Sequence, residues 1–388
     1  MSPVSVSIAG ALSLAVAMGI GRFAFTPMLP LMLRAGDVDV AQGGWLAAAN
    51  YVGYLVGALS APRLRMPPVR LAFAALLLIA VVTAAMGVLH APWLLGLLRF
   101  LAGAGSALAF VGTSVWCLGA LAAWGRPTWG GAVYAGVGGG IALAGIYCLL
   151  GARGGLSVAS LWVQLGVLAL VLALLVRSMV RRPDGVAGAP APAAGATGAP
   201  GTRGLVICYG LMGFGYILPA TFLPVQARAV VDDPALFGLA WPVFGAMAAL
   251  STLAAGWVLR KASRLNVWAV SHLAMGLGVL LPSLWLSGWS IACAAVLVGG
   301  TFMVATMAGM QEARARATGD PTRLLSRMTA AFAIGQIAGP VVSSALAYLP
   351  LTGGNALNLA LQIAAVALLL SAAWLRRFSS RTTPAKGP

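Results

Sequence analysis

Two arginines stand inside long apolar runs of this chain. Arg22 lies in "AMGIGRFAFTPMLPLML" (17–33), and Arg99 lies in "LLRFLAGAGSALAF" (97–110). A guanidinium in hydrocarbon is costly and normally faces protein or water with a partner. Its planar fork suits a carboxylate or a phosphate, so both residues are candidates for binding an anion. The alternatives are that Arg22 snorkels to headgroups or caps carbonyls freed by the prolines, and that Arg99 clamps helices together.

No carboxylate accompanies these arginines within an apolar run. The acidic residues fall in the segments between runs or at the end of a run, and they are Asp37, Asp39, Asp184, Asp232, Asp233, Glu312 and Asp320. Neither arginine therefore has an obvious permanent counter-ion. An anion supplied from outside the chain is their natural partner.

Other polar residues within apolar runs could complete such a site. They are Asn50, Tyr54, Tyr216, Thr301 and Gln336. Each of these, taken alone, is more often an interhelical hydrogen bond than a ligand contact. Glu312 and His272 are weaker candidates for gating or proton coupling. A solvated helix end is the competing interpretation for Glu312, and a hydrogen-bonded packing residue for His272.

The amino-acid composition indicates that the elements holding these residues lie in a membrane. The chain has 388 residues, of which 61% are hydrophobic and 8% are charged. A soluble protein carries about 25% charged residues, so this is an integral membrane protein. The net charge is +17, and the basic residues that produce it fall in short clusters between the apolar runs. This distribution is typical of the loops between transmembrane helices and argues against nucleic-acid binding. The four cysteines form no CxxC pair, and no cofactor or metal site is predicted.

Twelve apolar runs are long enough to cross a bilayer as helices. They cover approximately 5–30, 42–61, 70–90, 93–120, 129–150, 156–176, 204–229, 236–258, 266–287, 289–310, 328–349 and 355–375. We therefore predict an all-α polytopic membrane protein with twelve transmembrane helices.

The basic residues predict the orientation of these helices. With both termini in the cytoplasm, 19 of the 24 Lys and Arg residues fall on the cytoplasmic side and three on the outer side. Arg22 and Arg99 are the remaining two. Such a bias favours this orientation. On this map, the two arginines lie about seven and six residues from the outer ends of the first and fourth spans, which places them at a similar depth.

The chain divides into two related halves. The segment 177–203 is rich in Pro, Ala and Gly and predicts a flexible cytoplasmic linker between six-helix bundles at 1–176 and 204–375, with a cytoplasmic tail at 376–388. "MGIGRFAFTPMLP" (18–30) also matches "MGFGYILPATFLP" (212–224) at five of thirteen positions. The bundles are therefore predicted to be pseudo-symmetric.

Several glycines are predicted to allow close helix packing rather than to bind phosphate, because no P-loop lysine follows them. They are Gly19, Gly21, Gly103, Gly105, Gly136, Gly140, Gly213, Gly215, Gly335 and Gly339.

Four segments carry a resemblance to a known family. They are "GIGRFAFTPMLPLM" (19–32), "WLAAANYVGYLVGAL" (45–59), "GFGYILPATFLP" (213–224) and "GGTFMVATMAGMQEAR" (299–314). They resemble the YbfB/YjiJ-type branch of the major facilitator superfamily. That resemblance implies a secondary transporter of the bacterial inner membrane, which rocks one half against the other around a central cavity lined by the first and fourth spans.

Two wider motifs of the superfamily are partly present. Arg99, Gly103 and Gly105 are similar to its fourth-span pattern of an arginine followed by GxG. The loop after the second span keeps Gly57 and its basic residues, but Ala61 stands where an acidic residue is usual. That loop therefore lacks the acidic residue of the usual charge-relay gate.

The resulting prediction is a monomeric transporter of a small, anionic organic solute. An inside-negative potential favours anion exit by about 2.3 kcal/mol per charge per 100 mV, so export or exchange needs no membrane carboxylate. Protons remain a candidate coupling ion for import. The main alternative is a proton antiporter that exports bulky apolar or cationic drugs. A membrane-embedded enzyme is a remote one, because clustered His, Asp and Glu residues are missing.

Overall fold

A computed structural model of the chain describes residues 2–180, 201–228, 230, 234–347 and 355–382, and these residues form helices and short connections without any strand. The first half contains α1 (Pro3–Leu14), the π-helix η1 (Ala15–Phe23), α2 (Phe25–Ala35), α3 (Val40–Ser60), α4 (Pro68–Ala85), α5 (Pro92–Ala123), the 3-10 turn η2 (Pro127–Trp129), α6 (Gly130–Arg153) and α7 (Val158–Met179). The second half contains α8 (Thr202–Arg228), α9 (Pro234–Val258), α10 (Arg264–Leu284), α11 (Gly288–Arg316), α12 (Pro321–Ala347) and α13 (Ala356–Thr382).

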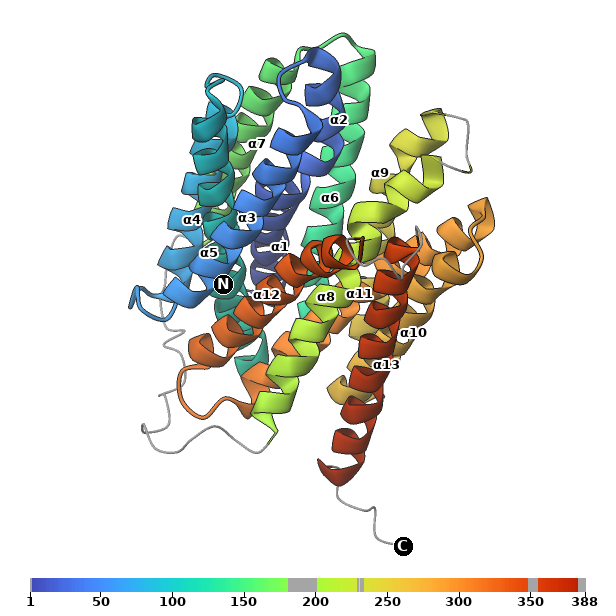
Figure 1. Ribbon diagram of the computed structural model, residues 1–388. Coiled ribbons are helices and arrows are strands. Elements are labelled where there is room, and N and C mark those ends of the chain that lie inside the picture. The colour runs from blue at the N-terminus through green and yellow to red at the C-terminus, as the bar shows by residue number, and fades with distance from the viewer. Residues whose placement is uncertain (1, 181–200, 229, 231–233, 348–354, 383–388) are drawn as a thin grey trace, which may run out of the picture.

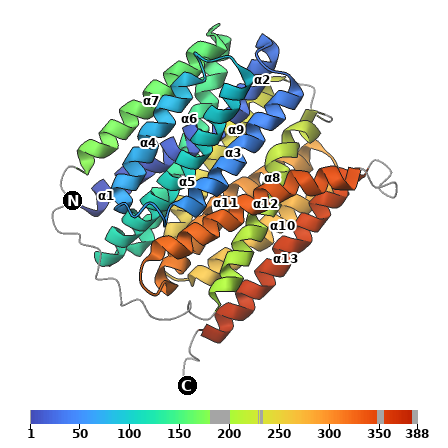
Figure 2. The same cartoon turned by 60° about the vertical axis from the view of Figure 1, so that its left-hand side comes forward.

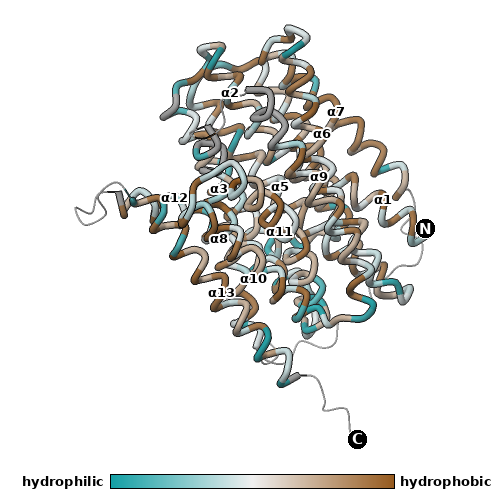
Figure 3. Tube along the Cα trace, turned by 90° about the vertical axis from the view of Figure 1, so that its right-hand side faces the viewer, coloured by the Kyte–Doolittle hydropathy of each residue, from teal (hydrophilic) through white to brown (hydrophobic). Residues whose placement is uncertain are grey.

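These elements correspond to the twelve predicted spans. Eleven continuous helical segments of the described chain are long and apolar enough to cross a membrane, and α1, η1 and α2 together form the first of them. The twelfth, α3, does not reach that hydropathy, because Gln42 and Asn50 interrupt its apolar sequence. Apolar residues run along most of the helices, and polar residues gather toward their ends (Figure 3). The chain is a multi-pass membrane protein.

Several helices extend further than the sequence pattern predicts. The first span continues to Ala35, so Arg22 lies 13 residues before its end rather than about seven. The tenth continues to Arg316 and the eleventh begins at Pro321, so charged residues occupy helical turns that were assigned to a loop. The last helix reaches Thr382, within the predicted tail. Residues 181–200 of the predicted linker lie outside the described residues.

One end of the bundle carries most of the charge. The connections at 61–67, 124–129, 259–263 and 317–320 meet there, and we call it the basic end because it bears Arg63, Arg65, Arg126, Arg260 and Lys261. The connections at 36–39, 86–91, 154–157 and 285–287 form the opposite end and contain no Lys or Arg.

The helices gather in two groups along the chain. In Figure 1, α1 to α7 (blue to green) lie on one side and α8 to α13 (yellow-green to red) on the other. Helices α7 and α13 lie on opposite flanks of the molecule (Figure 2). The groups meet mainly where α6 packs on α9 and where α12 packs on α3.

The first helix of each group packs closely on its fifth. In the first group, a Cβ atom at Gly140 would lie only 2.6 Å from the carbonyl oxygen of Ala15, so the two backbones are in direct contact. In the second group, Gly335 of α12 lies against the backbone of Gly210 in α8. Glycine removes the side chain that would hold these helices apart. Both groups therefore use the same kind of contact to position their first helix.

Candidate functional site

The site begins at a departure from α-helical geometry in the first span. Residues 15–23 form a π-helix, which is rare and which is frequently found at functional sites. Pro27 and Pro30 follow in α2 and lack the amide hydrogens that an α-helix would use to bond the carbonyls four residues earlier. Within η1, the carbonyl oxygens of Gly21 and Arg22 accept hydrogen bonds from side chains of α3 and α5.

Asn50 and Arg99 supply those hydrogen bonds. The amide nitrogen of Asn50 donates to the carbonyl of Gly21 at 3.5 Å and to that of Arg99 at 3.0 Å. The guanidinium of Arg99 donates from Nη1 to the Gly21 carbonyl and from Nη2 to the Arg22 carbonyl, each at 3.5 Å. Gly103 permits this geometry, because its Cα lies against the backbone of Asn50. These two side chains hold the π-helix in place.

Arg22 lies between the two halves. Its side chain is 3% exposed, and Nη2 donates a hydrogen bond to the Oε1 atom of Gln336 in α12. Its Cζ atom is 4.1 Å from the ring centroid of Tyr54 and 5.5 Å from that of Tyr51, which places it over two aromatic faces of α3. These contacts stabilise a cation without neutralising it.

Arg99 is equally buried but is used differently. Its exposure is also 3%, and its Cζ atom lies 4.3 Å from the ring centroid of Phe25. Two of its three nitrogens bond to backbone carbonyls of η1. The fork of Arg99 is therefore directed at the first span, and the fork of Arg22 is directed at the opposite half.

A closed circuit of aromatic rings connects Arg22 to the second half. Neighbouring ring centroids along it are between 4.8 and 6.2 Å apart, and Arg22 contacts both ends. In order, the rings are Phe23, Trp241, Phe244, Phe302, Tyr216 and Phe332. We call this set the aromatic circuit. It excludes water from the guanidinium and offers flat apolar surfaces beside it.

Six buried polar atoms around Arg22 have no hydrogen-bond partner among the described residues. They are Nε and Nη1 of Arg22, Nε of Arg99, Oδ1 of Asn50, the hydroxyl of Tyr216 and Nε2 of Gln336. Buried polar groups are normally hydrogen-bonded, and an unpaired buried donor is costly. Five of the six can donate, so the arrangement is suited to a group that accepts.

The structure thus brings together most of the predicted site residues and separates the others. Arg22, Arg99, Asn50, Tyr54 and Gln336 form one cluster, and Tyr216 lies in the aromatic circuit beside it. The hydroxyl of Thr301 donates to the carbonyl of Leu297 at 2.5 Å, within its own helix.

The predicted gating candidates lie elsewhere. His272 is fully buried between α10 and α13, where Nε2 accepts from the indole of Trp268 at 2.8 Å and Nδ1 lies 2.9 Å from the hydroxyl of Ser371. Glu312 lies at the basic end and pairs with Nε of Arg264 at 2.8 Å and Nε of Arg316 at 2.5 Å. Its carboxylate is committed to these two cations.

Sequence reasoning named Tyr54 and Tyr216 but none of the other aromatic residues around Arg22. Phe23 stands directly after Arg22, but its partner Trp241 comes from α9 and is separated by more than 200 residues. Tyr51 and Phe332 also approach Arg22 without any local motif. Aromatic residues are common in membrane helices, so only the assembled fold distinguishes these positions.

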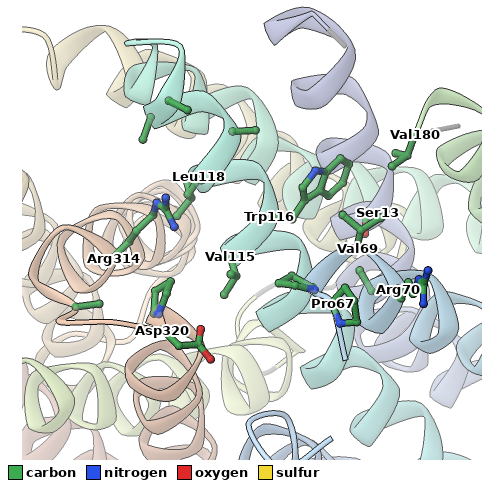
Figure 4. Close-up of a pocket in the computed structure, with 18 of the residues that line it drawn as sticks. Ser13, Pro67, Val69, Arg70, Val115, Trp116, Leu118, Val180, Arg314 and Asp320 are labelled. Atoms are coloured by element: carbon green, nitrogen blue, oxygen red, sulfur yellow. The ribbon is translucent and has the colours of Figure 1, made fainter. Parts of the chain in front are cut away.

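A large cavity lies at the basic end rather than around Arg22. Its volume is about 1530 Å³, and its walls come from α4, α5, α7 and α11 (Figure 4). The charged side chains on its lining include Arg70, Arg177, Arg314 and Asp320. Arg314 of α11 is half-buried beside Gly119 of α5, so the two halves approach each other at this point. Neither Arg22 nor Arg99 belongs to the lining.

The two groups of helices around a central polar cluster define a transporter of the major facilitator superfamily, a class that is not enzymatic. The sequence matches the description "Uncharacterised MFS-type transporter YbfB" over residues 14–376, and the chain belongs to this family. Among the solved structures that match, the crystal structure of the human organic anion transporter MFSD10 (TETRAN) has a TM-score of 0.72 and 14% sequence identity. That match covers 97% of this chain and 100% of the other. The comparison with curated proteins finds no significant match.

Proposed function

We propose that this transporter moves a small organic anion across the bacterial inner membrane by alternating access and binds that anion through Arg22. The observation that carries the proposal is the state of the Arg22 guanidinium. It is buried between the halves, it bonds to Gln336, and Nε and Nη1 have no partner among the described residues. A buried cation without a carboxylate is strongly unfavourable, and an anionic substrate would relieve it.

Arg99 has a supporting role in this proposal. It holds the carbonyls of Gly21 and Arg22, and thereby fixes the stretch of backbone from which the Arg22 side chain emerges. A second cation close to the site also makes the local potential more favourable to an anion. Arg99 is therefore a positioning residue, and Arg22 is the residue that contacts the substrate.

The orientation and coupling follow from charge. The basic end would face the cytoplasm, as the distribution of Lys and Arg predicts. Both ion pairs of the described chain involve Glu312 at that end, so they leave Arg22 uncompensated. The membrane potential alone then favours anion export or exchange, while import would need protons or another coupling ion. The MFSD10 structure, which is described as that of an organic anion transporter, shows that this fold can serve such substrates.

Flux into proteoliposomes tests the proposal. The probes are radiolabelled lactate, succinate, benzoate and inorganic phosphate, and protein-free liposomes give the passive leak of each. We expect saturable uptake of at least one organic anion. Arg22→Ala should lower that uptake about 100-fold or more, because two charge-assisted hydrogen bonds of about 1.5–3 kcal/mol each are lost.

Arg34→Ala is the matched control, since Arg34 is an exposed arginine in the same span. Its uptake should equal that of the unmodified protein. Equal uptake by the Arg22→Ala variant would remove Arg22 from the substrate site.

The export of bulky apolar or cationic drugs is the competing function, and the aromatic circuit favours it. Apolar rings bind an apolar drug well, but a buried arginine repels a cation. Efflux of a lipophilic cationic dye that is insensitive to every anion in the panel would support this alternative and contradict the anion proposal.

A further inference from the structure

Part of the aromatic circuit is a column of nearly parallel rings that ends at Arg22. Trp241 and Phe244 are inclined by 2° with centroids 5.3 Å apart, and Phe244 and Phe302 by 23° at 5.2 Å. The column continues from Phe302 to Tyr216 at 18° and 4.8 Å, and from Tyr216 to Phe332 at 25° and 6.2 Å. The Cζ atom of Arg22 lies 5.9 Å from the centroid of Phe332. Parallel faces of this kind select flat partners.

The column and the cation belong to different halves of the molecule. All five rings of the column come from α8, α9, α11 and α12, whereas Arg22 comes from η1. The contacts that join them include the hydrogen bond from Arg22 to Gln336 and the contact of Phe23 with Trp241 at 6.0 Å. When the halves rock apart, the guanidinium would separate from the rings and leave both accessible.

Unpaired donors lie at the junction of the column and the cation. The hydroxyl of Tyr216 is part of the column, and Nε2 of Gln336 belongs to the side chain that already accepts from Arg22. Together with Nε and Nη1 of Arg22, they provide four donors without a partner among the described residues. A carboxylate has about four acceptor sites, so it could accept a hydrogen bond from each of these donors.

The same surroundings disfavour other anions. Inorganic phosphate needs donors on every side, and the aromatic walls supply only the Tyr216 hydroxyl and the indole nitrogen of Trp241. A carboxylate on an aliphatic chain could reach Arg22, but it would gain only contact area against the rings. An aromatic ring gains stacking in addition.

We propose that the substrate is an aromatic carboxylate, whose carboxylate binds Arg22 while its ring stacks against the column formed by Trp241, Phe244, Phe302, Tyr216 and Phe332. This inference rests on the proposed function, because it presumes an anion at Arg22. It adds that the second half of the protein recognises the body of the substrate. Selectivity for the ring should therefore be separable from the requirement for charge.

Calorimetric titration of the detergent-purified protein tests this substrate class. Benzoate is compared with cyclohexanecarboxylate, which has the same carboxylate on a six-carbon ring without a π face, and with benzyl alcohol, which has the ring without the charge. We expect benzoate to bind about threefold to tenfold more tightly than cyclohexanecarboxylate. Benzyl alcohol should bind at least about tenfold more weakly than benzoate, because it lacks the charge.

Two variants locate the selectivity. Phe302→Leu removes the central ring of the column, and Phe110→Leu removes an equally buried ring of α5 that packs on Tyr134 at 6.0 Å, outside the column. The preference for benzoate should fall to about onefold in the first variant and persist in the second. Phe244→Leu gives the same test if Phe302→Leu does not fold.

The outcomes distinguish this inference from the anion proposal. Equal binding of both acids to the unmodified protein would overturn the aromatic substrate and leave an anion transporter. A preference for benzoate that survives Phe302→Leu and Phe244→Leu would overturn the assignment to the column. Binding of neither acid would overturn the aromatic substrate, and the uptake of lactate and succinate would then decide the anion proposal separately.

Discussion

The first helix of each half occupies an equivalent place but does different chemistry. Arg22 and Tyr216 are 194 residues apart, at matching positions of the repeated MGxG segment, and both are buried at the interface between the halves. The first half breaks into a π-helix at this level, whereas α8 continues as an α-helix from Thr202 to Arg228. In η1, the side chains of Asn50 and Arg99 donate to the carbonyls of Gly21 and Arg22. One half thus supplies the cation and the other supplies the rings.

The difference lies in the side chains and not in the helix packing. Gly19 lies against Gly140 of α6, and Gly213 lies against Phe332 of α12, so each first helix rests on the fifth helix of its half through a glycine. A shared packing frame allows the two buried positions to diverge without changing how the halves are built. Substitutions can test this arrangement, first at the glycine contacts between the first and fifth helices and then at the buried polar atoms.

The largest effect is expected from disrupting the glycine contact between the first and fifth helices of a half. Gly140→Val should prevent the first half from folding, because its Cβ would meet the carbonyl of Ala15 at 2.6 Å and neither backbone can move aside. We expect a loss of at least about 3 kcal/mol in stability. Thermal denaturation monitored by size-exclusion chromatography measures it. Gly139→Val is the adjacent control, because a Cβ there meets nothing within 4 Å.

The equivalent change in the second half sharpens the comparison. Gly335→Val should be as damaging as Gly140→Val, because Gly335 also lies against backbone. Gly300→Val in α11 is its control, since that position faces open space. A stable Gly335→Val protein would show that the two halves do not share one packing frame.

The next largest effect is expected from changing the shape of the cation. Arg22→Lys keeps the charge but replaces a planar fork with a point donor on a flexible stem. We expect uptake of the best anion in the panel to fall about 10- to 100-fold, as one charge-assisted hydrogen bond is lost. Concentration-dependent uptake into proteoliposomes measures it. Unchanged uptake in the lysine variant would mean that only the charge at this position matters.

A smaller effect is expected from Arg99, which acts through the backbone of η1. Arg99→Ala should reduce uptake about tenfold by releasing the carbonyls of Gly21 and Arg22. The Arg22→Ala/Arg99→Ala double variant should transport no more slowly than Arg22→Ala alone, because Arg99 then has no arginine side chain at position 22 to hold in place. Additive losses would instead indicate that Arg99 contacts the anion itself. Partial recovery in Arg99→Lys would support the positioning role.

The sequence predicted the frame better than the chemistry. Twelve helices, two related halves and a pair of membrane arginines follow from hydropathy and from one repeated segment. The π-helix could not be predicted, because Gly19 and Gly21 fit an α-helix equally well. Of the aromatic circuit, the sequence indicated only Tyr216, because the rings come from five elements and their contacts depend on how the halves meet. Local patterns predict where a charge is buried, while tertiary packing determines what surrounds it.

The smallest effect is expected from the residue that replaces arginine in the second half. Tyr216→Phe removes a buried hydroxyl that has no partner in the described part of the chain and keeps the ring that stacks on Phe302 at 4.8 Å. The melting temperature of the ligand-free protein should therefore stay the same or rise, because no hydrogen bond is lost and a buried polar group is removed. Anion affinity should fall by only about twofold to tenfold, the value of one neutral hydrogen bond. A lower melting temperature with unchanged affinity would make Tyr216 a structural residue and leave ligand recognition to Arg22.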